Sequence, residues 1–595
     1  MSSATPLSFY RTKLENVEIL LKDQQRKLRY ISLLRLFTVA AAVYFLVSAI
    51  RTGHSLLYIS SALLVILFFA LVSYHKTQKD RFDLLNELKK LNKEELEALE
   101  FSYAGRPDGN QYRDPHHPWS HDLDLFGPGS LYQYINRTAT LTGSKHLADL
   151  LTNPAASSGE VSVRQQRVRS LSAKNDFRQY YTATARLLKE QENDIPSLDR
   201  WRQSESYTTA NRWLRPYTIG ISILSLALVI AGIIDASFFR YLLPVVFLNW
   251  GVLTPFLVRN NRYHEMISRK AELMEQYARL LHLISQEDPE NETWGNAREL
   301  ALKGSRGIKN LSRLLGLFDQ RLNMFIGAIL NSLFLFDVQL IFLLERWKKQ
   351  NGSEIMEWVA LTGEVEAFIT LGGFAFNNPD YAYPELAQDR RLLVGRNLGH
   401  PLIPTGKRVV NDLSVDKEKV IVITGANMAG KSTFLRAVGV NMVLAYAGAP
   451  VCAAEFKTGM LTLFSSMRTS DSLKDEESYF LAEIRRLKQV VELMEKGTPM
   501  LILLDEVLKG TNTTDKQQGA IGLIKKSLRH EVLEFIATHD LILGNLEKEY
   551  PGEVVNYSFE SYIEDFDLVF DYRIRPGIAK NMNASFLMKK MGLME

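Results

Sequence analysis

A short segment near residue 425 constrains the fold of this chain more than any other feature. Residues 420–424 (VIVIT) form an apolar run typical of a buried strand, and a helical pattern starts at Phe434. The loop between them fits G-x-x-x-x-G-K-[ST] and consists of Gly425, Ala426, Asn427, Met428, Ala429, Gly430, Lys431, Ser432 and Thr433. In a strand–loop–helix unit, the backbone N–H groups of such a loop face a phosphate. The segment therefore predicts an α/β domain that binds a nucleotide.

The residue types in and after this loop predict how the nucleotide is handled. Lys431 is expected to reach the β- and γ-phosphates, and Ser432 to ligate Mg²⁺. A second buried-strand run, 500–504 (MLILL), ends in Asp505 and Glu506. An acid in the place of Asp505 holds Mg²⁺ through water, and the adjacent Glu506 can polarise the attacking water.

A third apolar run, 532–537, ends just before His539. At the tip of the next strand, a histidine is placed to contact the γ-phosphate, although a lone histidine is often structural. Together with the preceding residues, it predicts an ATP hydrolase that uses ATP and Mg²⁺, with Glu506 and His539 as catalytic residues.

Two pairs of uncharged apolar stretches lie upstream of this region. The first pair covers about 31–50 and 55–74, and the second about 217–234 and 241–258. Runs near 20 residues match the hydrocarbon thickness of a bilayer, and basic residues flank the outer ends of each pair. The pattern predicts two transmembrane hairpins that place the protein in the cytoplasmic membrane, with its remaining parts in the cytoplasm. Buried core helices are the alternative interpretation.

A fifth apolar stretch, 322–344, differs from these four. It contains Asn331, Asp337 and Gln339, whose side chains are costly in lipid. A fifth crossing would also move the nucleotide-binding region to the outside. We therefore expect one long, buried helix of the soluble part here.

The composition narrows the class of protein further. Lys and Arg number 71 and Asp and Glu 67, so the net charge is +4, and 46% of the residues are hydrophobic. This balance excludes a polycation and wholesale disorder. A single cysteine, Cys452, excludes an intramolecular disulfide. Asp114, His116, His117, His121 and Asp122 lie close together, but two prolines interrupt them, so a metal site is the less favoured interpretation.

Several motifs in the C-terminal third resemble those of the MutS family. The loop GANMAGKST is similar to the family's usual GPNMGGKST, with Asn427 and Met428 as the distinguishing pair. Residues 470–483 resemble the family signature, usually SDDLASGRSTFMVE, and residues 503–515 resemble LMDEIGRGTSTFD. Ala537-Thr-His539 matches the family's switch histidine, and residues 572–577 (YRIRPG) resemble the closing strand of its ATPase. Upstream motifs between 122 and 168 look like the start of the MutS core.

This resemblance implies an ABC-type P-loop ATPase that forms a homodimer. In the family, the signature of each subunit completes the nucleotide site of the other, so Ser478 is expected to contact the nucleotide in trans. The ATP state then moves long helices that clamp DNA. Mismatched, branched or structured DNA is thus an expected partner, and DNA mismatch repair the family role.

Two departures from the family pattern leave the partner open. The chain contains no Phe-x-Glu, the wedge of mismatch-reading members, and residues 408–412 (RVVND) lack the aromatic residue of the family's FxPND. Two hypotheses follow. One is a membrane-anchored, DNA-binding ATPase, and the other is a membrane ATPase that uses the same dimeric motor on a protein or membrane partner without binding DNA.

The expected architecture is a mainly α-helical core and lever region with two transmembrane hairpins, followed by an α/β ATPase domain. Its segments are 1–82 with the first hairpin, 83–215 as the first part of the core, 216–259 with the second hairpin, 260–387 as helical lever, and 388–595 as the ATPase domain.

Overall fold

The computed structural model describes most of the chain. It covers residues 5–205, 213–254, 263, 266–267, 270–287, 294–319, 324–468, 479–564 and 567–580. The chain forms two compact units that alternate along the sequence. The helical unit comprises 1–93, 138–144 and 176–366, and the sheet unit comprises 94–137, 145–175 and 367–595.

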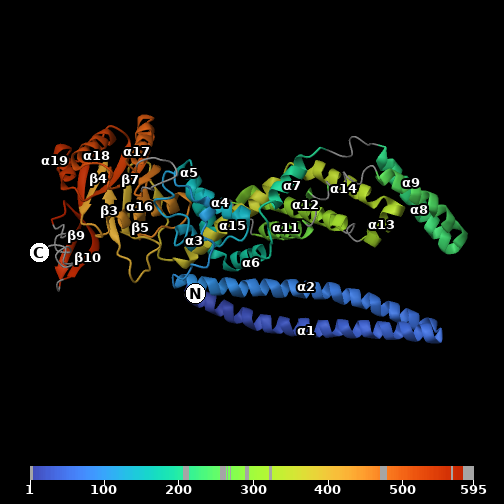
Figure 1. Ribbon diagram of the computed structural model, residues 1–595. Coiled ribbons are helices and arrows are strands. Elements are labelled where there is room, and N and C mark those ends of the chain that lie inside the picture. Colours follow the sequence, from blue (N-terminus) through green and yellow to red (C-terminus); the bar gives the residue numbers. More distant parts are fainter. Residues whose placement is uncertain are drawn as a thin grey trace. The chain divides into compact units, whose positions relative to one another are not determined.

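The first predicted hairpin belongs to two much longer helices, α1 (Pro6–Thr52) and α2 (Ser55–Leu99), drawn side by side in Figure 1. Thr5 caps α1 by accepting a hydrogen bond from Ser8 N, and Gly53 ends it with φ 72°. The helices pair antiparallel, since Gln24 Nε2 donates to Gln78 O and Ser61 Oγ donates to Ala42 O. At 47 residues, α1 is ~70 Å long, so only part of it lies within the predicted span.

Five described helices are long and apolar enough to cross a membrane. Four of them coincide with the predicted hairpins: α1, α2, α8 (Leu214–Ile234) and the run Ala236–Leu253, which combines η2 (Ala236–Tyr241) with α9 (Leu242–Leu253). Their apolar windows are only 6–22% buried, whereas the window of the fifth, α15 (Ile355–Asn377), is 78% buried. The helix α15 is therefore a core helix, and the other four expose apolar side chains.

The described part of the helical unit contains six further helices, and one of them, α12, packs closely against Trp358. They are α6 (Asn175–Arg186), α7 (Asp194–Gln203), α11 (Ala271–Ser285), α12 (Gly295–Asp319), α13 (Met324–Phe334) and α14 (Phe336–Asn351). Gly304 and Gly307 of α12 face Trp358, where an added Cβ would lie 2.8 and 2.7 Å from the indole ring. These glycines allow α12 to approach Trp358 closely.

The prediction of one continuous buried helix over 322–344 is wrong. Helices α13 and α14 meet at an angle of 83°, and Leu335 between them has the left-handed φ of 50°. This conformation frees backbone groups that a continuous helix would pair. Polar side chains hydrogen-bond some of these groups, among them Asn331 and Gln339, which together with Asp337 had suggested burial in the soluble part.

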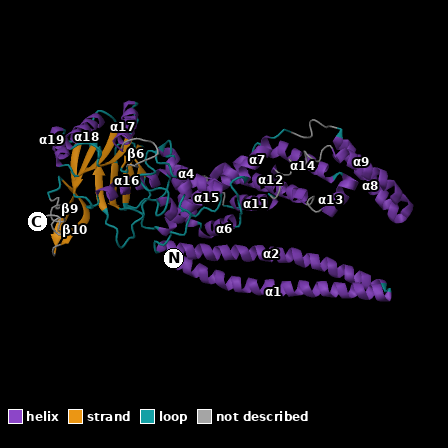
Figure 2. Ribbon diagram, viewed as in Figure 1, coloured by secondary structure: helices purple, strands orange, loops and turns teal. Residues whose placement is uncertain are grey.

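The sheet unit contains the predicted α/β domain, with strands and helices coloured separately in Figure 2. Its main sheet has the order β10-β9-β4-β8-β7-β6, parallel except for β10. The strands are β4 (Val420–Gly425), β6 (Thr462–Ser466), β7 (Met500–Asp505), β8 (Val532–Thr538), β9 (Val554–Glu564) and β10 (Asp567–Pro576). The combination of helical core and α/β domain agrees with the predicted fold class.

A smaller sheet has the order β1-β5-β2-β3, and helices complete the sheet unit. Its strands are β1 (Glu385–Leu386), β2 (Leu393–Leu398), β3 (Asn411–Val415) and β5 (Glu455–Thr458). The helices are η1 (Asn110–Tyr112), α3 (Leu131–Ile135), α4 (Leu141–Thr152), α5 (Ser158–Ala173), α16 (Lys431–Tyr446), α17 (Tyr479–Glu495), α18 (Thr513–Ser527), η6 (Leu541–Asn545) and α19 (Leu546–Glu549). The first part of α4 belongs to the helical unit.

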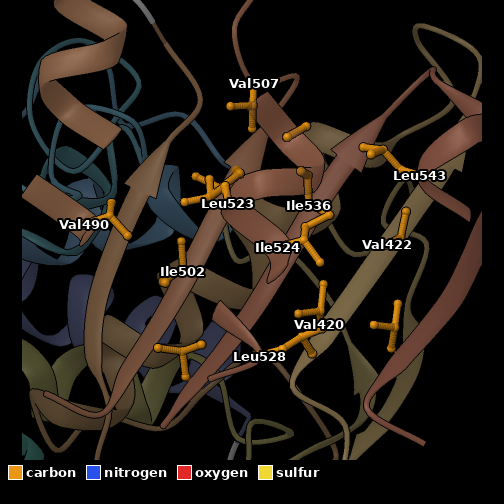
Figure 3. Packing of buried hydrophobic residues seen from close by; sticks show 14 of the residues in the cluster. Val420, Val422, Val490, Ile502, Val507, Leu523, Ile524, Leu528, Ile536 and Leu543 are labelled. Carbon is orange, nitrogen blue, oxygen red and sulfur yellow. The ribbon is translucent and has the colours of Figure 1, made fainter. Parts of the chain in front are cut away.

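A cluster of buried apolar side chains packs against the main sheet. Val420, Ile502 and Ile536 of adjacent strands pack against Leu523 and Ile524 of α18, as Figure 3 shows. Burying each such side chain contributes ~1.5–3 kcal/mol. This packing fixes the carboxyl ends of β4, β8 and β7 relative to each other.

Candidate nucleotide site

Three neighbouring parallel strands bring the predicted site residues to one edge of the main sheet. The strands β4, β8 and β7 are adjacent, with Thr424 opposite Thr538 and Asp505 opposite Ala537. The loop 425–430 follows β4, His539 follows β8, and Glu506 follows β7. Ligands of open parallel sheets bind at such carboxyl ends.

The loop after β4 requires glycine at both ends. Gly425 has φ 152°, and a Cβ there would lie 2.6 Å from the carbonyl oxygen of Phe559. Gly430 has φ 108° and is the N-cap of α16. Met428 also has a positive φ, 71°, and its side chain is 78% exposed. Glycine allows the left-handed backbone at both ends of the loop, as the sequence motif anticipated, whereas Met428 adopts it in the middle of the loop at a steric cost.

Lys431, the first residue of α16, is buried inside the loop. Its ammonium donates to Gly425 O at 2.7 Å and to Ala426 O at 2.9 Å. Burial lowers the pKa of Lys431, while the nearby carboxylates of Glu506 and Asp505 act to raise it. The positive charge thus lies within the loop and next to both acids.

Glu506 and His539 contact each other directly. His539 Nδ1 lies 3.0 Å from Glu506 Oε1, and Lys509 Nζ lies 4.0 Å from Glu506 Oε2. Burial acts to raise the pKa of Glu506, but the hydrogen bond and charge of His539 and the charges of Lys509 and Lys431 lower it overall. Glu506 is therefore an ionised carboxylate at neutral pH, as a proton acceptor has to be.

The segment after Glu506 has an unusual backbone that α17 supports. Glu506 and Leu508 have positive φ values of 56° and 60°. The carboxylate of Glu483, on α17, accepts the backbone N–H groups of Leu508 and Lys509. Glu483 is 4% exposed, and burial raises its pKa. This support was missed at the level of sequence, although Glu483 ends the signature-like segment 470–483.

The loop, Lys431 and Glu506 open onto one pocket of about 620 Å³, whereas His539 is not among its lining residues and contacts Glu506 beside it. Its lining includes the predicted residues Asn427, Met428, Gly430, Lys431, Ser432, Thr433, Asp505 and Glu506. It also includes His400 and Phe559, which the sequence did not single out, and Asn411 and Tyr572, which belong to the family-like segments 408–412 and 572–577. Gly425, Ala426 and Ala429 belong to the same loop but do not line the pocket.

Tyr572 is placed at this pocket by Asn411. The Asn411 side chain donates to Tyr572 O at 3.1 Å and accepts Ile574 N at 2.8 Å. Tyr572 itself has φ 55° and is 46% exposed. An exposed aromatic ring of β10 therefore lies at the pocket. It belongs to the YRIRPG segment, which from its sequence was expected only to form the closing strand of the ATPase.

The donor set suits a magnesium ion that is bound together with phosphates. Ser432 supplies a hydroxyl and Asp505 a carboxylate to the same pocket. Mg²⁺ usually takes one or two protein oxygens and completes its shell with phosphates and water. No cluster of three or more His, Cys, Asp or Glu side chains suited to a metal occurs in the part of the chain that the structure describes. That finding also covers residues 114–122.

Asp122 in that segment has another partner. Its carboxylate accepts hydrogen bonds from Arg486 Nη2 at 2.9 Å, from Ser465 Oγ at 2.8 Å and from Arg468 N at 2.8 Å. These contacts attach the segment around residue 122 to β6 and α17. Ser478, the residue expected to act in trans, lies outside the described residues.

Comparison with known proteins decides the family. Residues 421–591 match the family described as MutS domain V. Through this domain, the chain belongs to the MutS family. A DNA mismatch repair protein MutS of Chlorobium phaeovibrioides is 34% identical over 219 residues, which are 35% of this chain and 24% of that protein.

Further MutS-family relatives match the same share of the chain. A DNA mismatch repair protein MutS of Thermotoga neapolitana is 34% identical over 204 residues, 34% of this chain and 25% of that protein. A DNA mismatch repair protein MSH3 of Debaryomyces hansenii is 25% identical over 244 residues, 38% of this chain and 24% of that protein. The chain thus spans about a quarter of the length of these relatives.

Proposed function

We propose that this MutS-family chain is a membrane-anchored ATPase whose ATP cycle drives a dimeric clamp on DNA. The observation that carries the proposal is the convergence of Lys431, Ser432, Asp505 and Glu506 on one pocket at the carboxyl ends of adjacent parallel strands. Such a set combines phosphate binding, a magnesium site and an ionised general base, as ATP hydrolysis requires.

In this proposal, each residue at the pocket has a defined task. The loop backbone and Lys431 bind the β- and γ-phosphates, and Ser432 and Asp505 hold Mg²⁺, which neutralises phosphate charge. Glu506 Oε1 is engaged by His539, so Oε2 accepts the proton of the attacking water. His539 orients Glu506 and contacts the γ-phosphate from the tip of β8.

The adenine is proposed to stack on Tyr572. The expected upstream aromatic residue is missing from 408–412, but Tyr572 presents an exposed ring at the pocket. Stacking of a base on an aromatic ring contributes ~1–3 kcal/mol. Asn411 then acts as a positioning residue through its two hydrogen bonds to β10.

The remaining elements of the proposal concern partners. The family resemblance supports a homodimer in which Ser478 contacts the nucleotide of the partner subunit, and DNA as the clamped substrate. The outward apolar windows of α1, α2, α8 and Ala236–Leu253 support anchoring in the bilayer of the cytoplasmic membrane. Basic flanking residues support a cytoplasmic location of the nucleotide site.

The test is the steady-state ATPase rate of the full chain in detergent, without DNA and with homoduplex, mismatched duplex and a four-way junction. Lys431→Ala serves as the blank. A rate that changes with DNA structure is the expected result, and the preferred structure identifies the substrate. A rate indifferent to every DNA, with the blank inactive, contradicts the DNA clamp and favours a motor that acts on a protein or membrane partner.

A further inference from the structure

The broken helix α13–α14 is not explained by the two predicted hairpins. Helix α13 has 11 residues and is apolar, and with α14 it forms a bent pair that is apolar enough for a membrane segment. Its length of ~16 Å is about half of the ~30 Å hydrocarbon thickness of a bilayer. A complete fifth crossing by α13 is therefore excluded on length.

Side chains from α8 and α14 form hydrogen bonds with the backbone at the helix break. Ser222 Oγ, on α8, donates to Phe334 O at 3.2 Å. Gln339 Nε2 donates to the same carbonyl at 2.8 Å and to Ser222 Oγ at 2.8 Å. The polar groups that the break releases are thus satisfied inside the protein, which is the condition for an irregular backbone at membrane depth.

The start of α14 is capped in the same way. Asn331 Oδ1 accepts the backbone N–H of Asp337 at 3.0 Å, and Asn331 is buried. Asn331 and Gln339 had argued against lipid because polar side chains are costly there. Here their amide groups point into the helix break, so they no longer argue against a lipid-facing α13.

Two further hydrogen bonds join α13 to α9. The fully buried Asn249 donates from Nδ2 to Ser332 O at 2.7 Å, and Trp250 Nε1 donates to Ser332 Oγ at 2.9 Å. Figure 1 shows α13 near α8 and α9, and the contacts between these helices agree with it. Ser332, near the carboxyl end of α13, therefore joins α13 to the second hairpin.

The first two turns of α13 expose apolar side chains. Phe325 is 76% exposed and Ile329 is 60% exposed. The neighbouring helices expose side chains of the same kind, with Phe247 of α9 at 71% and Ile223 of α8 at 65%. The apolar surface thus continues from the two predicted spans onto α13, and exposed apolar surface of this extent marks a lipid or protein contact.

We infer that α13 is inserted in the hydrocarbon of the bilayer beside α8 and α9, as a re-entrant half-helix whose exposed face contacts lipid. A segment that enters and leaves on one side keeps α14 and the nucleotide site on the same side of the membrane as α12. The inference rests on the proposed anchoring by α8 and α9, whose apolar surface α13 extends. It makes the second membrane element a three-helix unit that continues directly into the α14 helix of the core.

The experiment places a fluorescent probe on α13 and measures its contact with acyl chains. Ile329→Cys in the full chain is labelled with a nitrobenzoxadiazole probe and reconstituted into phosphatidylcholine vesicles with or without lipids that carry a doxyl quencher on the acyl chain. Ile230→Cys on α8 reports the anchoring itself, and Lys309→Cys on α12 is the aqueous control. The native Cys452 is 2% exposed, so the unsubstituted chain measures background labelling.

The expected result is a loss of fluorescence of about twofold or more at both Ile329 and Ile230, with little change at Lys309. Quenching at Ile230 without quenching at Ile329 overturns the inference for α13 and leaves the anchoring intact. A cross-link between two Ile329→Cys copies in that case identifies a second copy as the occupant. Absence of quenching at both sites overturns the anchoring as well. Phe325→Cys provides a second position on the same face, and unchanged ATPase activity verifies that each labelled variant is folded.

Discussion

His539 Nδ1 lies 3.0 Å from Glu506 Oε1, and this contact joins the ends of two adjacent strands, β8 and β7. The contact has two consequences. It engages Oε1 of Glu506 and not Oε2, and it holds the pKa of Glu506 below its usual value against the effect of burial.

The first prediction concerns this pair. Glu506→Gln removes the proton acceptor, so we expect the ATPase rate to fall by ~10²–10⁴-fold while ATP still binds and holds the dimer together. Rate measurement together with size-exclusion chromatography in ATP checks both expectations. A variant that hydrolyses ATP at the wild-type rate contradicts the assignment of Glu506 as base.

The pH dependence provides the second prediction. Because His539 lowers the pKa of Glu506, His539→Ala should raise that pKa towards the value that burial favours. Glu506 then becomes protonated at a higher pH than in wild type, so the acid limb of the kcat/KM profile should shift to higher pH. The profile of Lys496→Ala, a change of an exposed residue at the end of α17, should coincide with wild type. An unmoved acid limb in His539→Ala would contradict the coupling.

The third prediction tests how the nucleotide is recognised. Tyr572→Ala removes the proposed stacking ring and should weaken ATP binding by roughly 10-fold, whereas Tyr572→Phe should bind normally. Inhibition by inorganic triphosphate should be unchanged in both variants, because that ligand has no base. Tyr562→Ala, on the neighbouring strand β9, is the matched control. Equal weakening of ATP and triphosphate binding would point to a structural role of Tyr572 instead.

The position of the main candidate residues could be predicted from sequence because each belongs to a recognisable strand or to the segment after it. Asp505 ends β7, His539 directly follows β8, and Lys431 begins α16 after the loop that follows β4. Adjacent parallel strands end at one edge of a sheet. Local pattern and topology therefore agree at this site. Tyr572 was not assigned, since its approach to the pocket depends on its pairing with Asn411, 161 residues away.

The break at Leu335 could not be predicted in this way. Leucine carries no local signal for the left-handed conformation that it adopts. The break is stabilised by Ser222, which donates to the carbonyl of the preceding Phe334 and lies more than a hundred residues earlier in the chain. The polar residues Asn331 and Gln339 were visible in the sequence, but their role as partners of a helix break appears only once α8 is packed beside them. Likewise, the role of Glu483 depends on the backbone of Leu508, which the sequence pattern does not specify.

The last prediction concerns a buried acid in the centre of the main sheet. Glu534 of β8 is 0% exposed, and burial raises its pKa to about 7, although the Ser527 side chain acts to lower it. The folded-state pKa thus lies above the unfolded value of about 4.3. Between these values the native chain binds more protons than the unfolded chain, so this residue lowers stability as pH rises from about 4 to 7.

Glu534→Gln removes this titration, and we therefore expect the variant to gain stability over wild type as pH increases, by ~3–4 kcal/mol between pH 4 and pH 8. Thermal unfolding of both proteins in detergent at several pH values measures the difference. Glu531→Gln, an exposed acid just before the same strand, should show a much smaller pH-dependent difference from wild type. A constant offset between Glu534→Gln and wild type at every pH would contradict the raised pKa and would assign the effect to packing alone.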